Sequence, residues 1–220
     1  MSVPKLGFSA YLKIINSNPR PQRSIVRQRC RPSSGGYDFH KSFRHRVQQV
    51  SFDGLSITDA LASTQQIGRE PERNSARRAL EQFSLWKDDH PGDLASCPSI
   101  SFVSPAALFK LEFVPDFLLE IGGRRTAVHL WNTQHDLSRH LVLAALSSVA
   151  ARYPTENRPD DFAVLSLRDR TIYRWSEADR ETRALGERLL ELLDIQFASV
   201  RTELGLPASP ALDEPRAPRP

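Results

Sequence analysis

The stretch from residue 113 to residue 133 constrains the fold of this chain most, because it contains two apolar runs joined by Gly122-Gly123. Glycine reaches the positive φ values that a tight turn requires, so the pattern predicts an antiparallel β-hairpin. Asp116 lies in the first run, directly after Pro115. A carboxylate inside an apolar strand has to be solvated, paired or bound to a cation. Asp116 is therefore the first candidate for a functional site.

Hydrophobic periodicity predicts regular elements on both sides of this hairpin. Apolar residues at three- and four-residue spacing indicate helices over 71–89 and 136–152, and a long helix over 176–204. Ser176 followed by Asp179 is typical of a helix N-terminus. Alternating runs predict strands over 99–103, 108–121, 126–133, 162–167 and 171–175.

This order of elements predicts an α/β fold with a mixed central sheet flanked by helices, an αβββαβ core. A helical basic N-terminal extension precedes the core and a long C-terminal helix follows it. We expect a basic arm over 1–50, one α/β domain over 51–205, and a disordered tail rich in Pro and Ala over 206–220. The apolar stripe of the 176–204 helix fits the core or, alternatively, a contact with a second copy or another protein.

Charge is concentrated in the first 50 residues, which hold ten Lys and Arg residues and one acid, Asp38, a net charge near +9. Such a basic segment favours an anionic partner, and DNA or RNA is the commonest one. The alternatives are a solvated tail and a segment docked on an acidic face of the protein itself. The candidate nucleic-acid-binding residues in this segment are Arg20, Arg23, Arg27, Arg29, Arg31, Lys41 and Arg44.

Several classes of protein are excluded by the composition. No apolar run approaches the roughly 20 residues that span a bilayer, and no apolar run follows the N-terminus as in a secretory signal. Cys30 and Cys97 are far apart and lack metal-ligand spacing, as expected of free thiols in a reducing compartment. We therefore predict a cytoplasmic protein without a membrane segment. The phosphate-cradling, dinucleotide-binding, zinc-protease and serine-hydrolase motifs are absent.

The order helix, three strands, helix, strand, with Pro115-Asp116 on the second strand, resembles the PD-(D/E)xK nuclease-like superfamily over residues 71–175. The resemblance implies a strand aspartate and an acid-x-lysine on the next strand that together hold Mg²⁺ or Mn²⁺. Asp116 matches the aspartate, and Glu81 or Glu72 matches the acid of the core helix. His129-Leu130-Trp131 stands where acid-x-lysine belongs, so the third-strand motif is degenerate.

This departure leaves the roles of the site residues open. Asp116 is either a site residue or the partner of Arg124 or Arg125 across the hairpin. His129 and Trp131 point to one face of their strand, which is either a cleft or the core. In a cleft, Asp116 and His129 are the metal ligands, Asp116, His129 and Glu81 the catalytic residues, and Trp131 a surface for stacking a base.

Three functions are consistent with these patterns. The first is a nucleic-acid-associated, PD-(D/E)xK-like domain that has lost catalysis and serves as a binding or accessory module. The second is an active metal-dependent phosphodiesterase, a nuclease, with a rearranged site. The third is a protein-interaction or scaffold subunit that has no contact with nucleic acid.

Overall fold

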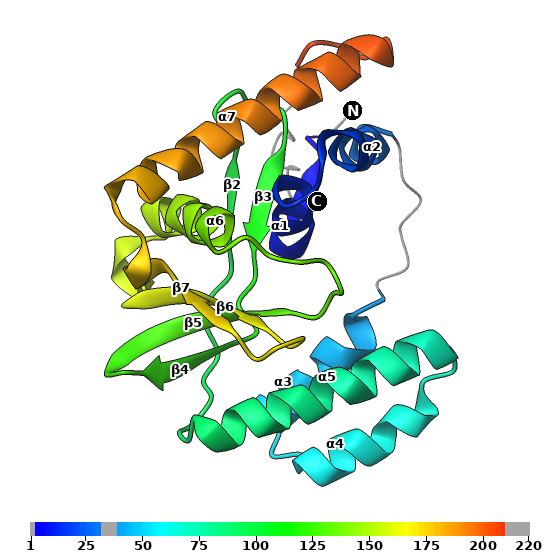
Figure 1. The fold of residues 1–220 in the computed structure, drawn as a ribbon, viewed down its shortest axis with the longest axis vertical. Helices are drawn as coiled ribbons and strands as arrows, with labels where there is room; N and C mark the ends of the chain where they lie inside the picture. Colours follow the sequence, from blue (N-terminus) through cyan, green and yellow to red (C-terminus); the bar gives the residue numbers. More distant parts are fainter. Residues whose placement is uncertain (1–2, 32–38, 210–220) are drawn as a thin grey trace, which may run out of the picture.

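A computed structural model describes residues 3–31 and 39–209 and confirms the mixed α/β class with a long C-terminal helix (Figure 1). The strands are β1 (Lys5–Gly7), β2 (Ile100–Val103), β3 (Lys110–Phe113), β4 (Phe117–Ile121), β5 (Arg124–Trp131), β6 (Asp161–Ser166) and β7 (Ile172–Arg174). The helices are α1 (Phe8–Ile15), α2 (Pro19–Arg29), α3 (Lys41–Phe52), α4 (Ile57–Ser63), α5 (Glu70–Asp89), α6 (Arg139–Arg152) and α7 (Arg180–Glu203). Residues 210–220, most of the predicted tail, lie outside the described residues.

The predicted hairpin forms the first half of a four-stranded sheet of order β4-β5-β6-β7. β4 and β5 are antiparallel, with Leu119 opposite Thr126. Gly122 and Gly123 have φ values of 59° and 73°, which confirms the turn that the Gly-Gly pair predicts. β6 is parallel to β5 and reaches it through α6, while β7 is antiparallel to β6.

The strand predicted over 108–121 is divided between two sheets. β3 lies in a three-stranded sheet of order β1-β3-β2, whereas β4 begins the four-stranded sheet. The chain leaves one sheet for the other at Val114-Pro115-Asp116, where Pro115 has no N–H for a strand ladder. Asp116 therefore lies in the connection between β3 and β4, and not inside a strand as we expected.

Helices lie on both sides of the four-stranded sheet, with α6 and, beyond it, α7 on one side and α3, α4 and α5 on the other (Figure 1). Alternate residues of β5 explain this division, because Trp131 packs into the α6–α7 core and Leu130 into the α3–α5 core. On the second face, Phe83 and Trp86 of α5 pack on Phe117, with ring centroids 5.7 and 6.0 Å apart.

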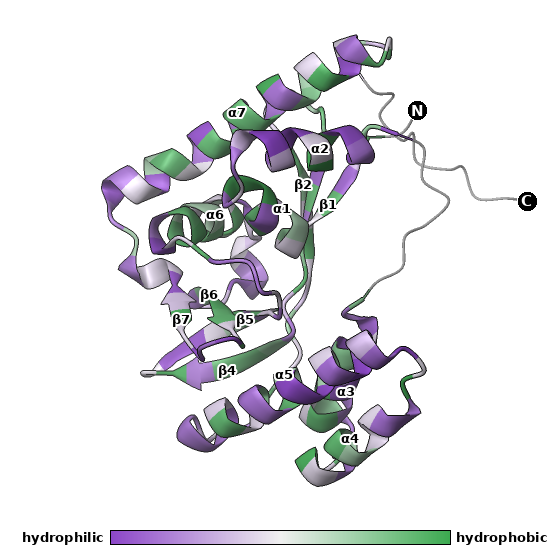
Figure 2. Ribbon diagram, turned by 45° about the vertical axis from the view of Figure 1, so that its right-hand side comes forward, coloured by the Kyte–Doolittle hydropathy of each residue, from purple (hydrophilic) through white to green (hydrophobic). Residues whose placement is uncertain are grey.

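The first part of the basic N-terminal segment is packed into the protein. β1 pairs in parallel with β3, and α1 buries Phe8, Tyr11 and Leu12 in the α6–α7 core. α2 then lies beside α7 and buries Val26, while most of its surface is hydrophilic (Figure 2). A solvated tail thus does not describe residues 3–31.

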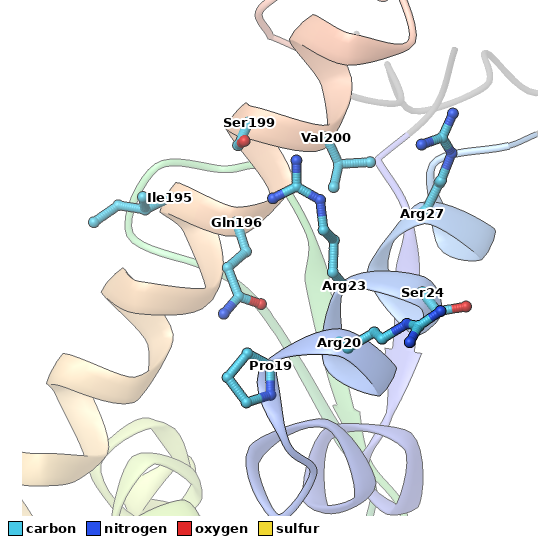
Figure 3. A pocket seen from close by; sticks show the side chains of 9 residues that line it. All are labelled: Pro19, Arg20, Arg23, Ser24, Arg27, Ile195, Gln196, Ser199 and Val200. Carbon is cyan, nitrogen blue, oxygen red and sulfur yellow. The ribbon is translucent and has the colours of Figure 1, made fainter.

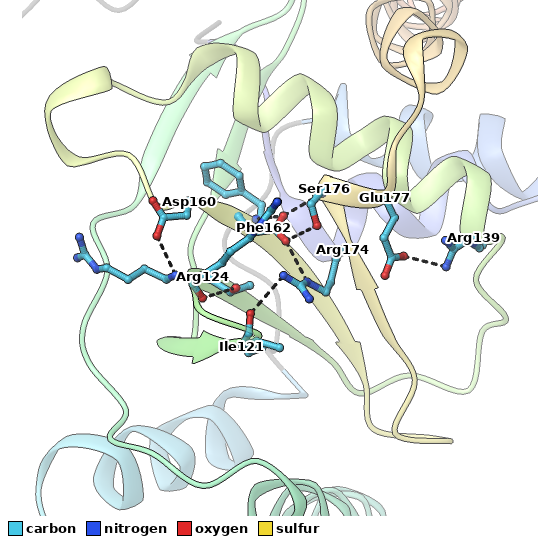
Figure 4. Close-up of polar contacts among 11 residues, drawn as sticks. Ile121, Arg124, Arg139, Asp160, Phe162, Arg174, Ser176 and Glu177 are labelled. Carbon is cyan, nitrogen blue, oxygen red and sulfur yellow. Dashed lines mark hydrogen bonds and ion pairs between the residues drawn. The ribbon is translucent and has the colours of Figure 1, made fainter.

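The long helix begins at Arg180 and not at Ser176. Its N-terminal cap is Asp179, whose carboxylate accepts a hydrogen bond of 2.7 Å from the Thr182 N–H. Ser176 instead donates from its N–H and its hydroxyl to Asp161, at 2.9 and 2.6 Å, and Arg174 donates to the same carboxylate (Figure 4). Ser176 is occupied by a tertiary contact, and the helix starts at the next capping residue. Across residues 3–31 and 39–209, no helix combines the length and the apolar character that crossing a bilayer demands.

Candidate functional site

Asp116 lies next to β5, and the backbone holds it on both sides. Its N–H donates to the Val128 carbonyl at 2.8 Å, and its carboxylate accepts a 2.7 Å hydrogen bond from the Leu130 N–H. The side chain is 8% exposed. The connection between the two sheets therefore places a nearly buried carboxylate beside the strand that carries the degenerate motif.

The cation that pairs with Asp116 is Arg44 of α3. Its Nε lies 3.3 Å from Asp116 Oδ1, and its Nη2 donates to the Ser9 hydroxyl of α1 at 3.1 Å. The salt bridge expected across the hairpin was wrong in its partner, because Arg124 and Arg125 lie opposite Ile121 and Glu120 at the other end of β4. Asp116 thus pairs with a residue from the segment assigned to nucleic-acid binding.

His129 is buried beside this ion pair, and its ring is 3% exposed. Its Nδ1 lies 3.1 Å from the Val114 carbonyl, which can only accept, so Nδ1 carries the proton. Nε2 is then the acceptor for the Ser9 hydroxyl at 2.8 Å. The Phe8 ring meets the imidazole edge-on, with centroids 5.3 Å apart. Nδ1 is 3.7 Å from Asp116 Oδ2, too far for a direct hydrogen bond.

Burial shifts the pKa values of both side chains. It lowers the pKa of His129 to about 3, and the Arg44 guanidinium adds to this effect. It raises the pKa of Asp116 to about 6, against the opposing effects of Arg44 and the Leu130 N–H. At neutral pH the site therefore holds a neutral imidazole, a carboxylate and a guanidinium.

The side chains of this site do not provide the ligands that a resident Mg²⁺ or Mn²⁺ ion requires. Such an ion prefers several oxygen ligands, whereas the site offers one carboxylate, already paired with Arg44, and an imidazole that accepts from Ser9. Glu81 is not brought to the site, because it is exposed on α5 and pairs with Arg77 at 3.1 Å. Glu72 is buried near the start of α5. Within residues 3–31 and 39–209, no three His, Cys, Asp or Glu side chains form a group able to hold a metal.

Trp131, the residue proposed to stack on a base, is 1% exposed and belongs to the α6–α7 core. Its indole N–H donates to the His135 carbonyl at 3.2 Å. The shared face of His129 and Trp131 is therefore the core face of β5, and a base could reach the ring of Trp131 only after that part of the core opened.

The basic residues on the α7 side of α2 line a groove of about 680 Å³ against α7 (Figure 3). Arg20, Arg23 and Arg27 lie on the α2 side, and Arg23 extends toward α7 (Figure 3). Arg23 and Arg27 both form ion pairs with Glu203 near the end of α7. Part of the charge of this face is thus neutralised within the protein.

The residues at the end of α2 line a second pocket, of about 490 Å³. Arg29 and Arg31 meet Lys5 and Lys13 there, two cations that were not among the predicted site residues. Lys41 is exposed on α3.

At the Asp116 site, Ser9 is a residue that the sequence did not indicate. It lies 120 residues from His129 in the chain, and no motif surrounds it.

No protein-family model matches this chain, and no curated protein matches its sequence.

Proposed function

We propose that this chain is a PD-(D/E)xK-like domain that binds nucleic acid and no longer cleaves it. One observation carries this proposal: the Arg44 guanidinium lies against Asp116 and within 3.5 Å of His129, the two residues expected to hold a metal. A guanidinium supplies positive charge and hydrogen-bond donors but has no open coordination position that could activate water.

Surface charge supports the binding half of the proposal. Arg20, Arg29, Arg31 and Lys41 are exposed, and none of them forms an ion pair with another described residue. Exposed Arg and Lys side chains contact phosphates and release counterions, which makes the affinity depend on salt.

The buried Trp131 is not part of the proposed binding surface. The cytoplasmic location expected from the sequence stays a prediction.

The salt dependence of binding tests the proposal. Fluorescence anisotropy with labelled DNA and RNA is expected to give an affinity that falls steeply between about 50 and 200 mM salt. The double variant Arg29→Gln/Arg31→Gln is expected to bind more weakly and to reduce the salt slope by about one to two. The matched control is Arg180→Gln/Arg188→Gln, which removes two exposed charges from α7. Absence of binding, or an equal loss in the control, would contradict the proposal.

A cleavage assay separates this function from an active nuclease. DNA and RNA are incubated with Mg²⁺ or Mn²⁺, and we expect the wild type and Asp116→Asn to leave them equally intact. Metal-dependent cleavage by the wild type that disappears in Asp116→Asn would favour the nuclease with a rearranged site.

A second candidate function is protein interaction through α7. Its support is the exposure of two apolar residues there, Leu192 at 54% and Ile195 at 65%. Leu193, between these two residues in the sequence, is buried in the core at 2%. The matched test is light scattering of the wild type and Leu192→Ser/Ile195→Ser. A larger mass that the variant loses supports a homodimer. An equal monomer mass for both removes the homodimer.

A further inference from the structure

The pocket at the end of α2 gathers cations from separate segments of the chain. It is lined by Lys5 of β1, Ala10 and Lys13 of α1, Ile25, Gln28 and Arg29 of α2, and Arg31. Four of these seven lining residues are Lys or Arg. They converge because β1 and α1 are packed into the core while α2 folds back beside them (Figure 2).

Most of the charge of this pocket has no acidic partner in the part of the chain that the structure describes. Lys5 pairs with Glu112 of β3 at 3.6 Å. For Lys13, Arg29 and Arg31, no ion pair with any acid in residues 3–31 and 39–209 occurs, and no described acid lines the pocket. On the opposite side of α2, Glu203 pairs with two arginines. Like charges that converge without an acid repel one another and favour a counter-anion.

The number and convergence of these cations indicate the class of anion. A diester phosphate within a strand carries one negative charge, whereas a terminal phosphate monoester carries about −1.5 to −2 near pH 7. The two arginines can each form paired hydrogen bonds to phosphate oxygens, and the lysines add point charges. A concave site with four cations matches the more highly charged, more compact group.

We propose that this pocket binds a terminal phosphate or a polyphosphate, an anionic group with more charge than one backbone phosphate. This inference rests on the proposed function, to which it adds the part of the nucleic acid that is held, a phosphorylated end. A free nucleotide polyphosphate has the same chemistry, and the experiment distinguishes the two sources.

The test compares oligonucleotides of one sequence that carry a 5′-phosphate, a 3′-phosphate or hydroxyls at both ends, with anisotropy as the readout. We expect one phosphorylated form to bind about tenfold more tightly than the hydroxyl form, the gain typical of added hydrogen bonds to a charged group. Lys13→Gln and Arg29→Gln are expected to abolish this preference. Arg20→Gln, on the other side of the same helix, is the control and is expected to keep the preference while weakening all three affinities alike.

Calorimetry with tripolyphosphate alone completes the test. If the oligonucleotides do not bind but tripolyphosphate binds and is lost in Lys13→Gln and Arg29→Gln, the pocket is a polyphosphate site and the proposed nucleic-acid function fails. If all three oligonucleotides bind equally, the pocket contacts only backbone phosphates, which overturns the inference and leaves nucleic-acid binding in place. If neither the oligonucleotides nor tripolyphosphate bind, both proposals are overturned.

Discussion

The site around Asp116 and the pocket at the end of α2 both contain charged residues. They differ in whether those charges are paired within the protein. At Asp116, the carboxylate, the imidazole and the guanidinium each have a partner within 3.5 Å inside the protein. In the pocket, three of four cations have no acidic partner among the described residues. Burial of a charge costs free energy unless the charge is paired, whereas a solvated charge stays free to meet a ligand.

The two regions also differ in what they connect. The Asp116 site draws residues from α1, α3, the β3–β4 connection and β5, so it links α1, which packs in the α6–α7 core, and α3, which packs on the other side of the sheet, to the strands. The pocket draws only on β1, α1, α2 and Arg31. We therefore expect changes at the first region to act on stability and changes at the second to act on binding.

The largest effect should follow from removing the cation that pairs with the buried Asp116 carboxylate. Arg44→Met leaves the Asp116 carboxylate with the Leu130 N–H as its remaining polar contact, and we expect a loss of about 3 kcal/mol in the free energy of unfolding. Denaturant unfolding at neutral pH measures it. Adding Asp116→Asn, which keeps an acceptor for Leu130 but removes the charge, should recover about 1–2 kcal/mol. An Arg44→Met variant within about 0.5 kcal/mol of the wild type would show that the pair does not anchor the fold.

The next effect depends on pH. The pKa of His129 falls from 6.5 to about 3 on folding, so between these values only the unfolded chain takes up the proton, and stability falls as pH falls. The pKa of Asp116 rises from 3.8 to about 6, so the folded protein takes up that proton, and stability rises as pH falls. The two contributions oppose each other in the window where they overlap.

His129→Gln removes the first contribution and leaves the second. We expect its stability deficit relative to the wild type to shrink by about 1–2 kcal/mol between about pH 6 and pH 4. Denaturant unfolding at a series of pH values measures the deficit, with His45→Gln, an exposed histidine of α3, as the matched control. A deficit that stays constant with pH would contradict the assignment of a neutral His129.

A smaller effect is expected from making the two sides of α2 alike. Glu203→Gln releases Arg23 and Arg27, which should tighten nucleic-acid binding about threefold at low salt and steepen the salt dependence. Stability should change by only about 0–1 kcal/mol, because the pairs are partly exposed. Anisotropy titrations measure the affinity, and Glu191→Gln on the exposed face of α7 is the control. An unchanged affinity would show that this side of α2 does not meet the ligand.

The smallest effect concerns the stability of the pocket itself. Lys13→Gln/Arg29→Gln should change the free energy of unfolding by less than about 0.5 kcal/mol, with a slight gain at low salt because repulsion is relieved. Thermal unfolding at low and high salt checks this. A loss above about 1 kcal/mol would show that these residues stabilise the fold, as those around Asp116 are expected to do.

The elements that the sequence predicted well have local causes. The 71–89 helix is observed as Glu70–Asp89, and the Gly122-Gly123 turn is observed with positive φ at both glycines. Where a distant partner intervened, the prediction changed. Ser176 donates a hydrogen bond to Asp161 and does not cap the long helix. The run over 108–121 divides at Pro115 because its two halves pair with different strands.

The sequence alone determined the α/β class, the hairpin, the long helices and the excess of positive charge near the N-terminus, because these depend on neighbouring residues and on composition. The tertiary structure was needed to show that Asp116 pairs with Arg44, that Trp131 is buried, and which cations of α2 have no acidic partner among residues 3–31 and 39–209. Ion pairs and burial arise when segments far apart in the chain pack together. Ser9 and His129, 120 residues apart, meet because β1 places α1 beside the sheets.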